Sequence, residues 1–207
     1  MTAIEGVTDL SELNAEIAGC TECELAGTRT LSVPGEGRPD AQIMFIGEAP
    51  GYNEDQQGRP FVGQAGQFLD QLIASIGLRR ADVFIANVIK CRPPQNQDPL
   101  PHQLQACDKW LQQQIAAIAP KMVITLGRFS MAKYFPGQAI SRIHGQPNRF
   151  GQTIIVPMYH PAAALHQGSL RRVIEEDFKK LPPILKSALD EKKEPEPKPE
   201  IQQMRLL

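Results

Sequence analysis

Polar and aromatic side chains that could build a ligand site occur just after the apolar runs of this sequence. Glu48, Glu54 and Phe61 follow residues 43–46 in the stretch IGEAPGYNEDQQGRPFVGQAG. Asn87 lies near the end of a second apolar run, and His160 follows a later one. An amide offers both a donor and an acceptor, an imidazole can donate, and an aromatic ring offers a stacking face. Loops that carry such residues among glycines and prolines predict a site rather than simple connections.

Four cysteines form a second group of chemical interest. Cys20 and Cys23 make a C-x2-C pair, and fifteen residues separate Cys91 from Cys107. Four thiolates can make a tetrahedral site that suits zinc or an iron–sulfur cluster. A second C-x2-C pair would favour zinc, whereas the long second spacing suits a larger cluster contacted from several directions. Iron–sulfur binding is therefore favoured, with zinc and unligated core cysteines as the alternatives.

The elements that must position these residues can be predicted from hydrophobic patterning. Four apolar, β-branched runs alternate with helical patterns, the runs at 42–46, 83–88, 122–126 and 153–157 and the helices at 64–76, 101–118, 128–134 and 168–186. Such alternation predicts a single α/β domain with a central, mainly parallel four-stranded sheet flanked by helices. Because ligands bind outside the carboxyl ends of parallel strands, we expect Glu48, Glu54, Phe61, Asn87 and His160 to share one pocket.

Composition predicts one folded domain over residues 1–186 and a disordered, charged tail over 187–207. The longest apolar runs are shorter than a membrane span, and the acidic N-terminus is unlike a signal peptide, so a cytoplasmic monomer without membrane contact is expected. Residues 1–24 carry six acids and no Lys or Arg, and 190–207 carry five acids and four bases. With a total charge of −1, residues 25–189 carry +6, which is compatible with a phosphate-binding face.

Several segments in one order resemble the family 4 uracil-DNA glycosylases, the iron–sulfur branch of the uracil glycosylase superfamily. They are GEAPGYNEDQQGRPFVGQAG, NVIKCRPPQN, HPAAAL and the interleaved cysteines, and the resemblance covers about residues 13–185. It implies a uracil-DNA glycosylase-like fold and hydrolysis of the N-glycosidic bond of uracil in single- and double-stranded DNA. It also implies a [4Fe–4S] cluster on four ligands, Cys20, Cys23, Cys91 and Cys107.

A flipped uracil gives each pocket residue an expected role. Phe61 would stack on the ring, and the Asn87 amide would accept from N3–H and donate to O4, a pattern that cytosine lacks. His160 would donate to O2, where negative charge accumulates as the base leaves. The backbone at Gly47, Glu48 and Ala49 could approach uracil closely because glycines are permissive there.

Two carboxylates of this loop, Glu48 and Glu54, are further candidates for the site. By resemblance, Glu54 lies beside C5 of uracil, where it would collide with the methyl group of thymine. Ala49 stands where the best-known uracil glycosylases have an aspartate. Glu48 is therefore the candidate for stabilising the sugar cation and positioning water. The alternative is that Glu48 is structural and that the backbone and His160 supply the catalysis.

Candidate DNA contacts come from two loops, at 141–150 and 166–172. Arg142, Arg171 and Arg172 are candidates for phosphate binding, and Leu165 to Gln167 could wedge into the gap that a flipped nucleotide leaves. The alternative for each arginine is an ordinary solvated surface charge.

Two other functions are compatible with parts of the pattern. Relatives in the superfamily trap uracil covalently through a histidine in a basic insertion; here the corresponding segment, RPPQNQDPLPHQ, contains His102 but no Lys/Arg-rich insertion. A non-catalytic iron–sulfur protein associated with replication is the second alternative, and it would not need a uracil-shaped pocket.

The last five residues resemble the peptides with which partners bind bacterial sliding clamps. Gln203 could form hydrogen bonds at the mouth of a clamp groove, and Met204, Leu206 and Leu207 could fill apolar subsites. The preceding charged, proline-rich segment would act as an extended spacer. A chance match at a frayed terminus is the alternative.

Overall fold

Buried apolar strands form the centre of the fold in the computed structural model, which describes residues 9–190. The six strands of the sheet run in the order β1-β3-β2-β4-β6-β5. Their bounds are β1 Glu36–Gly37, β2 Ile43–Gly47, β3 Phe84–Asn87, β4 Met122–Leu126, β5 Asn148–Phe150 and β6 Thr153–Met158. The four central strands pair in parallel, and β1 and β5 pair antiparallel at the two edges.

The sequence correctly predicted the four central strands, but the predicted number of strands was too low. The two edge strands are only two and three residues long, and β5 is exposed along its whole length. Neither has the apolar run or the alternation from which a strand can be recognised in sequence. Their backbones complete the sheet through pairing with β3 and β6.

Nine helices are assigned within residues 9–190. They are α1 Leu10–Gly19, α2 Tyr52–Gln57, α3 Gln64–Ser75, α4 Pro101–Ile118, α5 Arg128–Ala132, α6 Ile140–Ile143, α7 Pro161–His166, α8 Ser169–Phe178 and α9 Leu181–Asp190. The helix predicted over 168–186 is two helices, α8 and α9. Pro182 and Pro183 lack backbone N–H groups and so cannot continue the hydrogen-bond ladder of α8. Both are tolerated in the first turn of α9.

Helix α9 continues to Asp190, four residues beyond the predicted end of the folded domain at 186. The remainder of the predicted tail, with the clamp-like peptide at 203–207, lies outside the described residues. Among the described helices, none combines the length and the apolar character that a membrane span requires.

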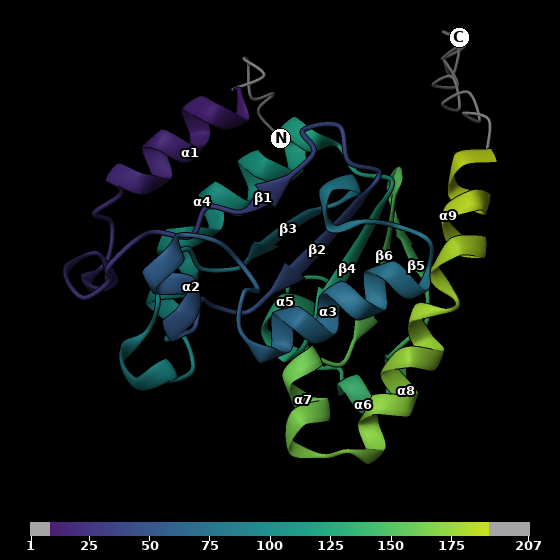
Figure 1. Ribbon diagram of the computed structural model, residues 1–207. Coiled ribbons are helices and arrows are strands. Elements are labelled where there is room, and N and C mark those ends of the chain that lie inside the picture. The colour runs from purple at the N-terminus through teal and green to yellow at the C-terminus, as the bar shows by residue number, and fades with distance from the viewer. Residues whose placement is uncertain (1–8, 191–207) are drawn as a thin grey trace, which may run out of the picture.

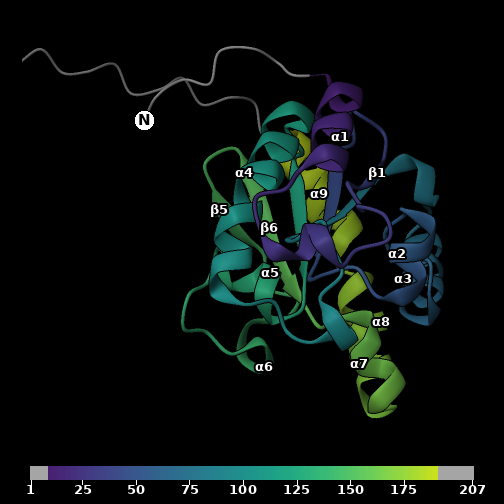
Figure 2. The same ribbon diagram turned by 90° about the vertical axis from the view of Figure 1, so that its left-hand side faces the viewer.

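The helices cover both faces of the sheet (Figures 1 and 2). On one face α3, α8 and α9 pack against inward-facing residues of β2, β3, β4 and β6. Phe45 of β2 and Phe178 of α8 stack there, with ring centroids 5.8 Å apart and planes 5° from parallel. On the other face, Leu111 and Ile118 of α4 pack against the strands. Because every residue of the central strands except Thr153 is buried, their sequences are nearly all apolar.

A third apolar cluster attaches α1 to α4 beside the sheet. Leu13 and Ile17 of α1 are fully buried and pack with Trp110 of α4 and Ile89, which follows β3. Cys91 and Cys107 are part of the same cluster, and Cys20 and Cys23 pack against it.

The order of the strands creates a crevice beside β2. The chain leaves β2 for β3 on one side, and then returns to place β4 on the other side of β2. In open α/β sheets, ligands bind outside the carboxyl ends of the strands where the order reverses in this way. The residues that follow β2 and end β3 therefore face the predicted site.

Replacing Phe178 with Ala should destabilise the fold by about 3–5 kcal/mol, because it deletes a fully buried aromatic ring from the core between the sheet and α8. Urea unfolding measures this change. Leu189→Ala on α9, where Leu189 is 51% exposed, is the control and should change the free energy of unfolding by less than about 0.5 kcal/mol. Equal losses for the two variants would contradict the described packing of Phe178.

Candidate active site

A cavity of about 640 Å³ opens at the carboxyl ends of β2 and β3. Its lining includes all five side chains that the sequence placed in one pocket, Glu48, Glu54, Phe61, Asn87 and His160. Ala49 also lines it, and Gly47 lies directly behind. The remaining lining residues were not predicted: Pro50, Gly51, Ala65, Pro93, Asn96, Gln97, Asp98, Ala162 and His166.

Gly47 allows two of the pocket side chains to meet. It pairs with Asn87 across β2 and β3. A Cβ atom at Gly47 would lie 2.4 Å from Asn87 Oδ1 and 2.6 Å from the ring of Phe61, so any larger residue would displace one or both. Asn87 is only 2% exposed, and its Oδ1 has no hydrogen-bond partner among residues 9–190. A buried acceptor without a donor is costly, so this amide oxygen suits a ligand that brings one.

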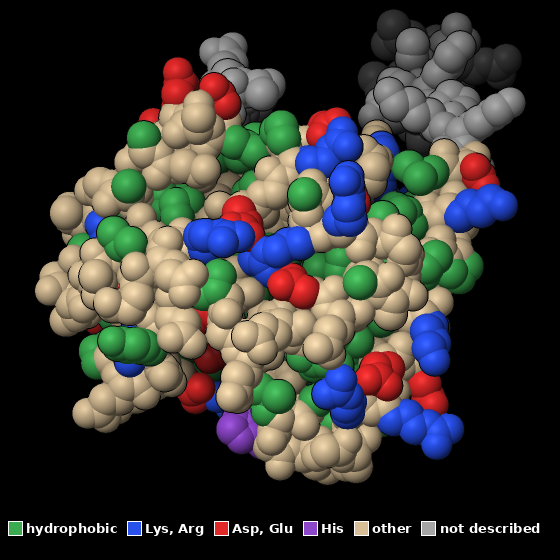
Figure 3. All heavy atoms as spheres, viewed as in Figure 1, with side chains coloured by type: hydrophobic (Ala, Val, Ile, Leu, Met, Phe, Trp, Pro, Cys, Tyr) green, Lys and Arg blue, Asp and Glu red, His purple; other side chains and the backbone are tan. Residues whose placement is uncertain are grey.

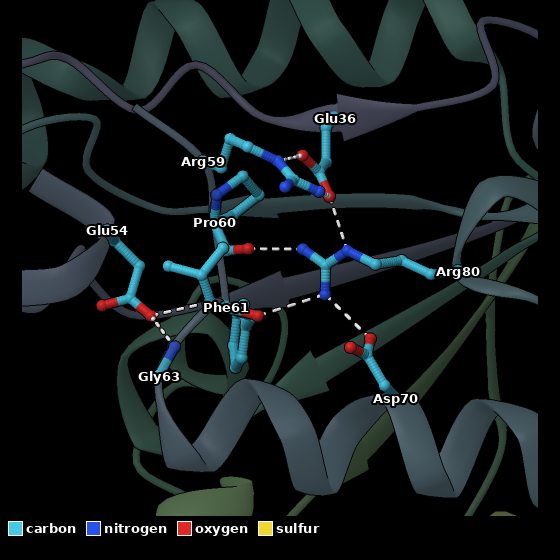
Figure 4. Close-up of polar contacts among 9 residues, drawn as sticks. Glu36, Glu54, Arg59, Pro60, Phe61, Gly63, Asp70 and Arg80 are labelled. Carbon is cyan, nitrogen blue, oxygen red and sulfur yellow. Dashed lines mark hydrogen bonds and ion pairs between the residues drawn. The ribbon is translucent and has the colours of Figure 1, made fainter. Parts of the chain in front are cut away.

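Phe61 has a left-handed backbone conformation, with φ of 49°. That region is unusual for a bulky residue and persists only where the surroundings hold it. Glu54 contributes part of the restraint: its Oε1 accepts from the backbone N–H groups of Val62 at 2.8 Å and Gly63 at 2.9 Å (Figure 4). Its Oε2 accepts from the backbone N–H of Gly51 at 3.1 Å. Glu54 therefore braces the loop as well as lining the pocket.

His160 caps the first turn of α7, and this contact determines its tautomer. Its Nδ1 accepts a hydrogen bond from the backbone N–H of Ala162 at 3.1 Å, which leaves the proton on Nε2. Burial lowers the pKa of His160 to about 4, although the negative charge of Glu54 acts in the opposite direction. The ring stacks on Phe61 with centroids 5.4 Å apart. At neutral pH the pocket thus contains an uncharged imidazole that can donate from Nε2.

Glu48 also lines the cavity. Burial raises its pKa, the negative charge of Asp98 adds to the rise, and Arg128 opposes it. Asp98 and Arg128 pair with each other at the rim. The Glu48 side chain makes no hydrogen bond to any of residues 9–190. A carboxylate with a raised pKa and no partner can orient and deprotonate a water molecule.

The four cysteines line one cavity between α1, α4 and the segment after β3. Three of the sulfurs accept hydrogen bonds: Cys20 from Trp110 Nε1 at 3.3 Å, Cys91 from Arg29 Nη1 at 3.0 Å and Cys107 from the backbone N–H of Lys90 at 3.2 Å. An all-sulfur set with N–H donors around it fits the chemistry of a thiolate-bound metal centre.

Two further properties of these cysteines concern metal binding and protonation. Within residues 9–190, no group of three or more His, Cys, Asp or Glu side chains is placed to hold a single metal ion. Burial raises the pKa of the Cys91 thiol, and it raises that of Cys107 to about 11. The nearby cations, Arg29 and Lys90, act to lower these values.

Lys90 is a buried residue that the sequence did not single out. Its Nζ donates to the backbone carbonyl of Asn87 at 2.9 Å and to Gln114 Oε1 at 2.7 Å. Burial lowers the pKa of Lys90 to about 8. The residue therefore connects the backbone of Asn87 with the cysteine region through α4. Only its place between Asn87 and Cys91 in the sequence could have signalled this.

The loop after β3 provides four of the nine lining residues that were missed. Asn96, Gln97 and Asp98 line the cavity, and Gln95 and Asn96 both have φ of 55°. Arg92 Nε donates to Asn96 Oδ1 at 2.7 Å, and its guanidinium group lies over the exposed ring of Tyr52 at 5.1 Å. The position of this proline-rich loop directly after a central strand was the available signal.

The predicted DNA contacts are in different environments. Leu165 is 46% exposed and precedes His166, which lines the cavity. Arg142 is exposed on α6. Arg171 pairs with Glu175, donates to Gln71 and lies over Phe68, and Arg172 pairs with Glu176. On the face that Figure 3 shows, basic and acidic side chains are interspersed.

Comparisons with known proteins identify the family to which this fold belongs. Residues 34–181 match the family model described as the uracil DNA glycosylase superfamily. The chain is 47% identical over 182 residues to the type-4 uracil-DNA glycosylase of Sulfurisphaera tokodaii, covering 83% of each chain. It is 45% identical to that of Archaeoglobus fulgidus, covering 83% of this chain and 91% of the relative. For the type-4 protein of Thermotoga maritima, the identity is 40% and the coverage 86% and 96%.

A type-5 uracil-DNA glycosylase of Thermus thermophilus is 33% identical over 48% of the chain. The match to the type-4 relatives is longer and stronger. The fold is of the α/β class, with a ligand pocket at the carboxyl ends of the parallel strands, where the strand order reverses. The chain belongs to the uracil DNA glycosylase superfamily, in its type-4 branch.

The pKa of His160 has a consequence for stability. Its folded-state value of about 4 lies below the ordinary 6.5, so its contribution is fully present above pH 6.5 and is lost as the pH falls toward 4. Urea unfolding at several pH values measures the free energy of unfolding of wild type and of His160→Gln. As the pH falls from 6.5 toward 4, wild type should lose stability relative to His160→Gln. A difference that is constant across the interval would show that His160 titrates alike in both states.

Proposed function

We propose that this chain removes uracil from DNA by hydrolysing its N-glycosidic bond, releasing free uracil and leaving an abasic site. The observation that carries the proposal is the buried, unpartnered amide oxygen of Asn87 beside the ring of Phe61. The similarity to type-4 uracil-DNA glycosylases over most of the chain supports the same function.

Uracil meets the hydrogen-bonding needs of Asn87. Its N3–H would donate to Oδ1, and its O4 would accept from the side-chain amide N–H. Cytosine offers an acceptor at N3 and an amino group at C4, so both contacts would be mismatched. A site built to form buried hydrogen bonds strongly rejects a ligand that leaves them unpaired. The Phe61 ring would stack on the base. Gly47 has no side chain and so leaves space for this ring.

The chemistry requires stabilisation of two developing charges. When the C1′–N1 bond breaks, its electron pair goes to the base and is shared with O2, and positive charge develops on the sugar. The Nε2–H of neutral His160 would donate to O2. Water then adds to C1′, and its proton passes to Glu48, whose raised pKa suits a base. The competing possibility is that His160 and the backbone carry the catalysis without Glu48.

Glu54 would exclude thymine by fixing the pocket wall beside C5 of the base. Its oxygens bind three backbone N–H groups, so the side chain is held in one place at the pocket wall. A rigid wall beside C5 would leave little space for a 5-methyl group.

The cysteine cavity would hold a [4Fe–4S] cluster on Cys20, Cys23, Cys91 and Cys107. The four cysteines line one cavity, and their single C-x2-C pair with its long second spacing favours a cluster over zinc. When bound, the cluster would supply four iron–thiolate bonds that tie α1, α4 and the segment after β3 together. Through Lys90, this segment also positions the backbone of Asn87.

The remaining assignments concern DNA and partners. Leu165, which is exposed and precedes the lining residue His166, is the proposed wedge, and Arg142 is the proposed phosphate contact. Arg171 and Arg172 would have to exchange their intramolecular partners to bind phosphate. We further propose that the protein is a monomer and acts on single- and double-stranded DNA. It would bind a sliding clamp through residues 203–207.

A duplex oligonucleotide with one uracil tests the function. The protein should release free uracil over many turnovers, leave cytosine and thymine intact, and also act on the single strand, where base flipping costs less. His160→Ala should lower turnover by about 10²–10³-fold, because it removes a donor to the departing base.

His102→Ala is the matched control, since His102 is an exposed histidine that pairs with Glu24 and does not line the pocket. It should keep wild-type turnover. A stoichiometric adduct that survives detergent would instead identify a covalent uracil binder, and a protein that binds DNA without releasing uracil would identify a non-catalytic one.

Metal analysis of anaerobically purified protein tests the cluster. About four irons per chain, with inorganic sulfide in equal amount, are expected. Cys107→Ala should lower the iron content and the unfolding temperature together, because the cluster links separate elements. One zinc per chain without iron would overturn the assignment.

A further inference from the structure

We propose that Arg80 is a positioning residue that fixes the stacking ring of Phe61, an inference that rests on the function proposed above. Arg80 opens the short 3-10 turn Arg80–Asp82 that precedes β3, nineteen residues after Phe61 in the chain. It does not line the cavity. Its effect on a uracil ligand would therefore pass through Phe61.

Arg80 holds the two peptide groups on either side of the Phe61 Cα atom. Nη1 donates to the carbonyl of Phe61 at 3.1 Å, and Nη2 donates to the carbonyl of Pro60 (Figure 4). The orientation of the peptide group that contains the Pro60 carbonyl depends on φ of Phe61. The orientation of the peptide group that contains the Phe61 carbonyl depends on ψ of Phe61. A single guanidinium group thus restrains both angles of a residue whose φ is 49°.

Glu54 restrains the same segment from the opposite side. It accepts from the N–H of Val62, which belongs to the peptide group whose carbonyl Arg80 binds. That peptide group is therefore held at both its oxygen and its nitrogen. Helix α3 closes the space below it, because a Cβ atom on Gly66 would lie 1.8 Å from the Phe61 carbonyl oxygen.

Arg80 is itself fixed by two carboxylates from different elements. Its Nε pairs with Glu36 of β1, and its Nη1 also pairs with Asp70 of α3 at 2.9 Å. Glu36 receives a second arginine, Arg59, at 2.7 Å. The Arg80 side chain is only 19% exposed, so water replaces its contacts poorly. The guanidinium group is thus oriented before any ligand arrives.

Loss of Arg80 should release the ring. Two carbonyls would lose their donors, and Phe61 could relax toward an ordinary negative φ, which would move its ring away from Gly47 and His160. A stacking face that is fixed in advance contributes to the rate by holding the base in a reactive position. Arg80→Gln should therefore impair catalysis while the sheet and its core stay folded.

Single-turnover cleavage of uracil-containing DNA measures the effect. Arg80→Gln should lower the rate by about 10–100-fold, the range expected for misplacing a reacting group. Arg79→Gln is the matched control: Arg79 is the adjacent arginine, its side chain is 83% exposed, and within residues 9–190 it pairs only with Asp82. It should keep the wild-type rate. Urea unfolding of each variant measures how much folded protein enters the assay.

A double-mutant cycle separates positioning from general damage. In a Phe61→Ala background, Arg80→Gln should slow cleavage less than about threefold further, because its target ring is already absent. Should Arg80→Gln not fold, Arg80→Lys serves instead. It keeps the charge for Glu36 and Asp70 but cannot hold both carbonyls in a fork, and it should show the same dependence on Phe61.

Two results would overturn the inference: an unchanged rate in the Arg80 variant, or an equal loss with and without the Phe61 ring. Neither would affect the proposed function, which fails only if the wild-type protein releases no uracil.

Discussion

The close approach at the end of β2 is the constraint on which the site depends. Gly47 has no side chain, and the space that a Cβ atom would fill is occupied by the amide of Asn87 and the ring of Phe61. Asn87 ends the neighbouring strand, so the register between β2 and β3 brings its side chain to this point. Phe61 belongs to a loop, so other residues must hold its ring beside Gly47. Much of the polar structure around the cavity follows from that requirement.

The loop that carries Phe61 is held by charged side chains that bind its backbone. Glu54 binds N–H groups on one side, and Arg80 binds carbonyls on the other. Charge-assisted hydrogen bonds are stronger than neutral ones and can maintain a left-handed conformation that an aromatic residue would otherwise avoid. A carboxylate placed at the pocket wall can thus have a structural role and still shape the space available to a base.

The electrostatic character of the cavity follows from burial rather than from net charge. The same desolvation that lowers the pKa of His160 raises that of Glu48, so the site combines a neutral donor with a carboxyl group that protonates more readily. The contact from Ala162 assigns the tautomer. Lys90 extends the arrangement toward the cysteines, because it joins the Asn87 backbone to α4. A cluster in the cysteine cavity and the Asn87 backbone would therefore share one support.

The sequence by itself determined the central strands, the principal helices on both faces, the cysteine set and five side chains of the pocket. Apolar runs at regular spacing identify buried parallel strands, and Glu48, Asn87 and His160 could be assigned to one crevice because such strands align their carboxyl ends. Only the tertiary structure decided the edge strands, which are two and three residues long and too short to carry a periodic signal. It also decided the bracing role of Glu54 and the position of Arg80 behind Phe61. The partners of a backbone carbonyl are selected by three-dimensional proximity, and hydrophobic patterning contains no information about them.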